Sequence, residues 1–231
     1  MARTKKESCK NAEEIIAFIR EKLIPNDEYK KFFESNYTEI KFTIEGYKVL
    51  KDVYEHRQIN DSFQRMFNSF YALSKLFVDE RFIIEFYKRM DKLKEEQKTY
   101  TAEDIVADAK ELSSKIEITE DSKRKKSLQL SFVTKMYNLK DEKYPIYDKM
   151  VALVFGIRKE HDDYIKDKNN TCVRWYKLIM DVYEKLLDDN DIKVIIEYFK
   201  TYFSCELKPM RILDIIVWQL GKAIDKAKQN K

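Results

Sequence analysis

A lysine and an aspartate in the stretch LQLSFVTKMYNLKDEKYPIYDKMVALVF have side chains that could do chemistry. Lys135 borders a helical stripe of apolar residues, and two interpretations of it stay open. Either its amino group extends to water, or burial lowers its pKa and makes the neutral amine a nucleophile. Asp148 follows Tyr-Pro-Ile-Tyr, and a carboxylate there could stabilise positive charge or deprotonate a nucleophile.

The elements around these two residues can be predicted from local sequence. The apolar stripe beside Lys135 has helical spacing and consists of Leu128, Phe132, Val133, Met136 and Tyr137. Pro145 disfavours helical backbone at the residue before it, so an extended approach to Asp148 is expected. Asp148 then stands at an N-cap position and is expected to accept the amide of Met150 or Val151. A cap and a catalyst are compatible, because capping uses one carboxylate oxygen and leaves the other available.

Four consecutive cations, Lys123, Arg124, Lys125 and Lys126, stand between two predicted helices. A run of this kind is usually a solvated loop. Where two helices turn tightly, however, cations and free amides at a helix N-terminus together form a phosphate-binding site. Both interpretations of the run stay open.

The overall composition predicts an all-α protein. The chain of 231 residues has 3 Gly and 3 Pro, too few for Gly-rich phosphate loops or the turns of antiparallel sheets. Its net charge of +4 is mildly basic, so only the distribution of charge could indicate nucleic acid. The 3 cysteines are scattered and there are 2 histidines, so no metal or other cofactor is expected. Scattered cysteines are typical of a reducing compartment.

Helices are predicted along nearly the whole chain, with a weakly extended stretch at 41–44. The expected helices are Ala12–Leu23, Glu28–Tyr37, Ile59–Leu76, Asp79–Leu93, Ala102–Ile116 (after a capping box at Thr101–Asp104), Thr171–Leu187, Asp191–Phe203 and Pro209–Lys222. Without a visible linker, residues 1–231 are expected to form a single helical domain. Its lobes, 1–100 and 101–222, are expected to share one core. The charged N-terminus and the absence of a long apolar run predict a cytoplasmic protein with no membrane partner.

The segment SFVTKMYNL…YPIYDKMV resembles the core of the helix-hairpin-helix DNA glycosylases, most of all their archaeal 8-oxoguanine glycosylase branch and related bacterial proteins. In that superfamily a hairpin of two helices binds the DNA backbone, and a catalytic aspartate follows a short apolar-Pro-apolar stretch. Asp148 matches this aspartate, and Lys135 matches the lysine of the archaeal branch. The segment RILDIIVWQLGK resembles the closing helix, which implies that Asp214 and Trp218 lie near the pocket. The resemblance covers residues 101–222.

The resemblance implies an all-α helix-hairpin-helix fold and a hydrolase that excises a damaged or modified base flipped out of DNA, as in base excision repair. Asp148 would stabilise the oxocarbenium-like sugar and activate water, or Lys135 would attack and permit strand cleavage by β-elimination. The cations at 123–126 would bind phosphates. The residues assigned to the base pocket are Gln129, Tyr144, Tyr147, Asp214 and Trp218.

Some features depart from the family pattern, and two other functions stay open. No glycine lies between Gly46 and Gly156, so the basic run is expected to replace the backbone grip of the family hairpin. In another register Gln129 or Lys126 takes the place of the lysine, and with Gln129 there the enzyme cleaves only the glycosidic bond. The other functions are a non-catalytic nucleic-acid-binding protein on the same scaffold and a helical interaction protein. The nearly balanced charge favours the latter.

Overall fold

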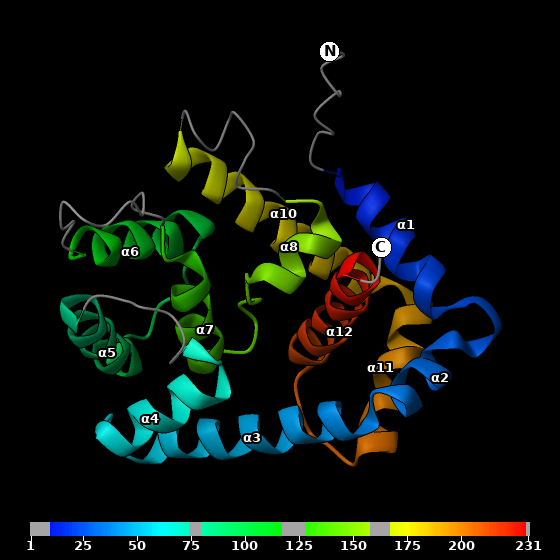
Figure 1. Cartoon of the computed structure of the whole chain (residues 1–231), viewed down its shortest axis with the longest axis horizontal. Coiled ribbons are helices and arrows are strands. Elements are labelled where there is room, and N and C mark those ends of the chain that lie inside the picture. The colour runs from blue at the N-terminus through cyan, green and yellow to red at the C-terminus, as the bar shows by residue number, and fades with distance from the viewer. Residues whose placement is uncertain (1–9, 74–79, 117–127, 158–166, 230–231) are drawn as a thin grey trace. The chain divides into compact units, whose positions relative to one another are not determined.

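A computed structural model describes residues 10–73, 80–116, 128–157 and 167–229 (Figure 1). All regular secondary structure in these ranges is helical, which confirms the all-α prediction. The chain divides into two compact units. We call Met1–Tyr37 with Lys143–Lys231 the terminal unit, and Thr38–Glu142 the central unit. No helix in the described ranges is long and apolar enough to cross a membrane.

These units do not coincide with the lobes expected at 1–100 and 101–222. The reason is that the first helices of the chain pack with the last ones: α1 (Ala12–Leu23) lies against α10 (Lys168–Asp188). The middle of the chain forms its own packed group, in which helices on both sides of residue 100 contact one another.

The terminal unit places its helices around α10 and α12. Besides α1 and α10 it contains η1 (Pro25–Asp27), α2 (Glu28–Ser35), α8 (Lys149–Phe155), α11 (Asn190–Phe203) and α12 (Pro209–Gln229). α12, red in Figure 1, packs along the short helix α8 and also contacts α10 and α11. A β-carbon at Gly221 would lie 2.2 Å from the carbonyl oxygen of Met150. Only glycine therefore permits this approach of α12 to the start of α8.

The central unit is built around α7. Its helices are α3 (Tyr37–His56, whose first residue belongs to the terminal unit), α4 (Asp61–Phe70), α5 (Glu80–Glu95), α6 (Ala102–Ser114) and α7 (Leu130–Lys140). α5 and α6 both pack against α7. The Phe132 ring meets those of Phe82 and Phe86 edge-on, with centroid distances of 5.3 and 5.8 Å. α7 is therefore buried nearly all round and not along one stripe.

Most of the predicted helices are present, and several have nearly the predicted ends. α1 spans the predicted residues, and α6 begins with the predicted capping box, in which the Thr101 and Asp104 side chains bind each other's amides. The helix expected over 59–76 ends at Phe70 within the described residues, and Ala72 has a left-handed φ of 52°.

The extended stretch predicted at 41–44 is wrong, because α3 is helical throughout. Ile40, Ile44 and Tyr47 recur at helical spacing and are fully buried, so packing of this face determines the structure. Phe42, which favoured a strand, lies on the other side of the helix and is 73% exposed.

Candidate active site

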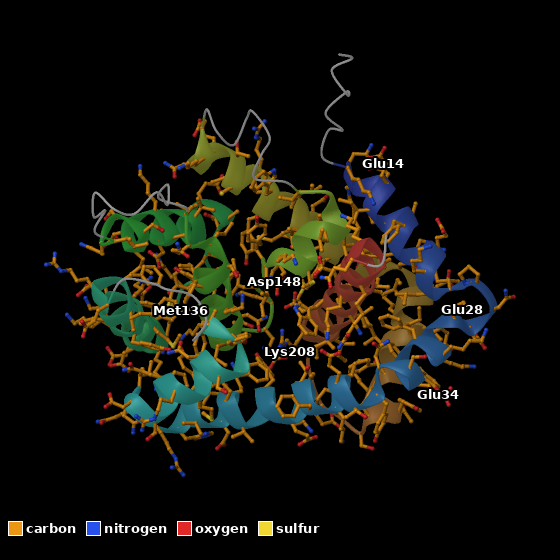
Figure 2. All side chains as sticks on the ribbon, viewed as in Figure 1. Glu14, Glu28, Glu34, Met136, Asp148 and Lys208 are labelled. Carbon is orange, nitrogen blue, oxygen red and sulfur yellow. The ribbon has the colours of Figure 1, made fainter. Side chains whose placement is uncertain are left out.

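Asp148 is the N-cap of α8, as the sequence predicted (Figure 2). Its backbone is extended, with φ −147° and ψ −174°. Its Oδ1 atom accepts the amides of Met150 at 2.8 Å and Val151 at 3.0 Å. The carboxylate is half-buried, and its Oδ2 atom accepts no hydrogen bond from the residues that the structure describes. The cap therefore fixes the carboxylate through one oxygen and does not use the other.

The segment that leads to Asp148 is held by α10. The Tyr176 hydroxyl donates to the carbonyl oxygen of Pro145 at 2.9 Å. The Tyr147 ring is stacked near the Trp175 ring, with centroids 6.5 Å apart and an interplanar angle of 18°. Tyr144 and Tyr147, two of the predicted pocket residues, are both buried, and Tyr147 packs near Trp175 of the same unit.

Asp214 of α12 holds the same segment from another side. Its carboxylate oxygens accept the Ile146 amide at 3.1 and 3.3 Å. Only 2% of Asp214 is exposed, and the Arg211 guanidinium lies 3.7 Å from it. The fully buried Tyr183 hydroxyl interacts electrostatically with Asp214 but forms no hydrogen bond of ordinary geometry with the described residues. The buried Asp214 carboxylate thus binds the amide of Ile146, and the half-buried Asp148 follows Ile146 and Tyr147 in the sequence.

Burial and the negative charge of Asp148 change the protonation of this cluster. Burial raises the pKa of Asp214 to about 7. The Arg211 charge and the Ile146 amide oppose the rise, whereas the Asp148 charge adds to it. Burial, followed by the charges of Asp214 and Asp148, also raises the pKa of Tyr183 well above its ordinary value. Asp214 is therefore protonated under mildly acidic conditions, and Tyr183 stays neutral.

We expect the stability of the protein to fall as Asp214 ionises. Because its folded-state pKa lies above the ordinary value of about 4, the folded protein binds more protons in the window between the two. The contribution of Asp214 is thus complete below about pH 4 and is lost as the pH rises through about 7, with a slope of at most about 1.4 kcal/mol per pH unit. Urea denaturation of wild type and Asp214→Asn across this window measures the difference in slope.

The matched control for this pH dependence is Asp225→Asn, on the same helix. Asp225 binds the exposed amino group of Lys149 at 2.8 Å and shows no such burial. This variant should keep the wild-type slope. An Asp214→Asn protein with the same slope as wild type would contradict the assignment.

Trp218 lies one helical turn after Asp214 on the same face of α12. It is half-buried, and the Lys222 amino group lies 4.9 Å from its ring centroid. The terminal unit therefore holds four of the predicted site residues besides Asp148: Tyr144, Tyr147, Asp214 and Trp218.

Lys135 and Gln129 belong to the central unit. Lys135 is 5% exposed, so its amino group does not extend to water. It donates to the Ser131 carbonyl oxygen at 2.9 Å and to the Ser131 hydroxyl at 2.7 Å, and lies 5.6 Å from the Tyr71 ring centroid. The Gln129 amide donates to the Ser113 hydroxyl at 2.9 Å, which joins the start of α7 to the end of α6. The basic run at 123–126 lies outside the described residues.

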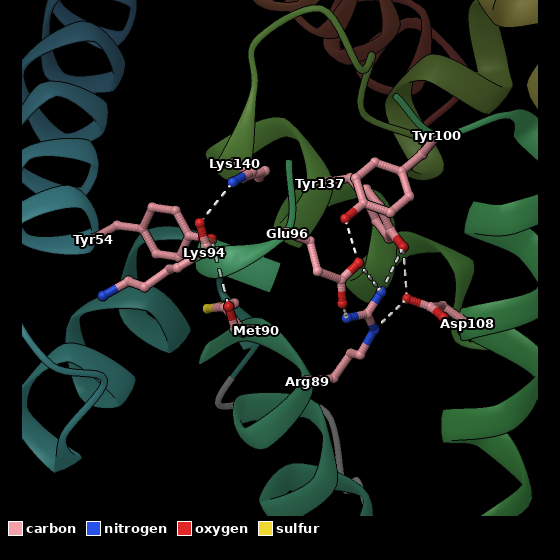
Figure 3. Close-up of polar contacts among 9 residues, drawn as sticks. All are labelled: Tyr54, Arg89, Met90, Lys94, Glu96, Tyr100, Asp108, Tyr137 and Lys140. Atoms are coloured by element: carbon pink, nitrogen blue, oxygen red, sulfur yellow. Dashed lines mark hydrogen bonds and ion pairs between the residues drawn. The ribbon is translucent and has the colours of Figure 1, made fainter. Parts of the chain in front are cut away.

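The central unit also contains a charged network that the sequence did not indicate (Figure 3). The Arg89 guanidinium binds Asp108 at 2.7 Å and also pairs with Glu96. The Tyr137 hydroxyl donates to Asp108 at 2.6 Å, and the Tyr100 hydroxyl donates to Glu96. Although burial opposes it, hydrogen bonds to the two carboxylates raise the pKa of Arg89. Because each charge is paired, this network is best understood as a support that joins α5, α6 and α7.

We expect Arg89→Met to lower the free energy of unfolding by about 1–2 kcal/mol, because it leaves two half-buried carboxylates without their cationic partner. Chemical denaturation measures the loss. Arg65→Met is the matched control in the same unit, since Arg65 is exposed and makes one long hydrogen bond, 3.4 Å, to Ser62. The control should change stability by no more than about 0.5 kcal/mol. Equal losses in the two variants would contradict a supporting role.

Sequence reasoning did not identify the partners of the Asp148 segment. Tyr176 and Trp175 lie in an aromatic helix whose spacing indicated only a core. Arg211 gave a usable signal, because an arginine and an aspartate three residues apart interrupt the apolar helix RILDIIVW. A charged pair on a helix face that must be buried indicates that a polar group of another element interacts with it.

Comparison of the chain with models of known protein families, with curated proteins and with solved structures finds no match.

Proposed function

We propose that the chain is a DNA glycosylase with a helix-hairpin-helix glycosylase-like fold, and that Asp148 is its catalytic carboxylate. The observation that carries the proposal is that both capping hydrogen bonds of Asp148 use Oδ1, so the cap does not occupy Oδ2. A carboxylate held in this way keeps its orientation during catalysis. The order of elements supports the fold: α6, α7, the non-helical segment that ends at Asp148, and α8 follow one another as in the family core.

The proposed reaction breaks the bond between C1′ of the deoxyribose and the base nitrogen. The electron pair of that bond leaves with the base, which takes up a proton. The sugar passes through an oxocarbenium-like state with positive charge near C1′. The Asp148 carboxylate stabilises this charge and accepts a proton from the water molecule that adds to C1′. The products are the free base and an abasic site.

A base that reacts in this way must leave the stack and meet an aromatic surface. Tyr147 is buried near Trp175, so its ring is part of the packed interior of the terminal unit. Trp218 is only half-buried and follows Asp214 by one turn on α12. We therefore propose Trp218 as the residue on which the extruded base stacks.

The proposal is tested with duplex and single-stranded oligonucleotides that carry a panel of damaged and modified bases. Chromatography measures the free base released by wild type and by Asp148→Asn, and DNA binding is measured at low and high salt. Release that is lost in Asp148→Asn supports the glycosylase. Absence of release, with salt-dependent binding that Asp148→Asn leaves unchanged, would favour a non-catalytic nucleic-acid-binding protein. Absence of both would favour a helical interaction protein.

The lyase step predicted for Lys135 is tested separately. If its neutral amine attacks C1′, the resulting Schiff base is reduced by borohydride to a stable protein–DNA adduct. We expect Lys135→Ala to abolish this adduct. Lys140→Ala, on the same helix, should keep it, because Lys140 donates to the Lys94 carbonyl oxygen as part of the packing of the central unit. A wild-type protein that releases base without forming an adduct would make Lys135 a structural residue.

A further inference from the structure

We propose that Asp214 is a positioning residue that fixes the segment before Asp148, and with it the direction of the Asp148 carboxylate; this role rests on the proposed glycosylase function. The Asp214 carboxylate accepts the Ile146 amide, two residues before Asp148, at 3.1 and 3.3 Å. Because only 2% of Asp214 is exposed, a contact with the protein's own backbone takes the place of the predicted contact with the base.

Residues 145–147 need such support because they lie outside the helices, between α7 and α8. Pro145 lacks an amide hydrogen, and its carbonyl oxygen is used by the Tyr176 hydroxyl. The Ile146 amide is used by Asp214, and Asp148 caps α8. Pro145, Ile146 and Asp148 are thus attached to α10, α12 and α8 in turn. A backbone attached in this way holds the side chain at its end in one orientation.

A contact that only stabilised the fold would not need a carboxylate at position 214. A buried amide could be satisfied by a neutral acceptor, such as a backbone carbonyl, without placing a carboxylate in the interior. Arg211 lies 3.7 Å from the carboxylate and offsets part of the cost of burial. The side chain also lies close enough to Asp148 for the two charges to interact. Both features are expected of a group that sets the orientation of the Asp148 carboxylate and the electrostatic potential around it.

The decisive variants are Asp214→Leu and Asp214→Asn. Leucine has the same branched arrangement of side-chain heavy atoms as aspartate but no acceptor, whereas asparagine keeps an acceptor oxygen for Ile146. Hydrogen exchange measured by NMR should show at least a tenfold loss of protection of the Ile146 amide in Asp214→Leu and near-complete rescue in Asp214→Asn. Asp225→Asn should match wild type. Unchanged exchange at Ile146 in Asp214→Leu would overturn the positioning role.

Kinetics separate positioning from simple support of the fold. For base release, we expect Asp214→Leu to lower kcat at least tenfold, with KM within about twofold of wild type, because DNA contacts remain while the Asp148 carboxylate loses its orientation. Asp214→Asn should recover most of kcat. A rise in KM at constant kcat would instead place Asp214 in substrate binding and overturn the inference.

One measurement needs no variant, and it keeps the proposal testable if Asp214→Leu does not fold. In the wild-type protein, the Ile146 amide shift should titrate with an inflection near pH 7, since the acceptor changes charge there. The Asp214 carboxyl signal is followed in the same titration, and an Asp214 inflection that the Ile146 amide shift does not follow would overturn the contact. A wild-type protein that releases no base would overturn the proposed function. The positioning role is judged separately, by hydrogen exchange and the chemical shift of the Ile146 amide.

Discussion

Replacing Gly221 by alanine is expected to lower the free energy of unfolding by about 4 kcal/mol or more. A β-carbon there would lie 2.2, 2.6 and 2.8 Å from the carbonyl oxygen, carbonyl carbon and Cα of Met150. All three are backbone atoms, so no side-chain rotation relieves the overlap and α8 and α12 must separate. Urea denaturation followed by circular dichroism measures the loss.

Gly46→Ala is the matched control, because Gly46 also lies inside a long helix. Its added β-carbon would lie 2.8 and 2.9 Å from two ring carbons of Phe70, a half-buried side chain that can move. The gain in helix propensity, about 1 kcal/mol, offsets that movement. We expect a change of no more than about 1 kcal/mol. Similar effects of the two substitutions would show that the backbone contact of Gly221 has no special importance.

The Gly221 contact is also connected to the candidate site. Met150, whose carbonyl group lies against Gly221, gives its amide to the Asp148 carboxylate. Separation of α8 from α12 must therefore disturb the cap that orients Asp148. Gly221→Ala protein that is still folded should release base more slowly than wild type, even though Gly221 has no side chain to offer a substrate.

Much of the helical structure could be predicted because its signals are local. The apolar spacing in α1 and the Thr101 capping box depend on residues within one or two turns of each other. The prediction failed at 41–44, where Phe42 and the β-branched Thr43 and Ile44 favour a strand by propensity. Burial of every third or fourth residue of α3 decides the outcome there, and this depends on tertiary packing.

The candidate site shows the same division between local and distant information. Asp148 could be predicted as a cap because Pro145 and the apolar run after it are its neighbours in sequence. Lys135 was expected at the edge of a stripe, but α7 is covered by both α5 and α6, so the edge is buried as well. The bond from Ile146 to Asp214 joins residues 68 positions apart, and no local pattern specifies such a pair.

Asp148→Asn is expected to reduce the rate of base release about a thousandfold, the range found for removing a charged or general-base group from a transition state. Asparagine has the size of aspartate and is an equally good N-cap, so the amides of Met150 and Val151 keep an acceptor. What the variant removes is the negative charge that stabilises the sugar and accepts a proton. Single-turnover kinetics on an oligonucleotide from which wild type releases base measure the effect on the rate. Chemical denaturation measures the effect on stability separately. Stability should change by no more than about 0.5 kcal/mol.

The same substitution at another helix start supplies the matched control. Asp167 is the N-cap of α10 and accepts the Asn170 amide at 3.2 Å, so Asp167→Asn removes a charge from an equivalent cap. It should leave both stability and base release close to wild type. If Asp148→Asn and Asp167→Asn release base equally fast, the Asp148 charge takes no part in the reaction, and Asp148 acts only as the N-cap of α8. If only Asp148→Asn is slow while its stability is unchanged, the oxygen that the cap leaves available is the one that the chemistry uses.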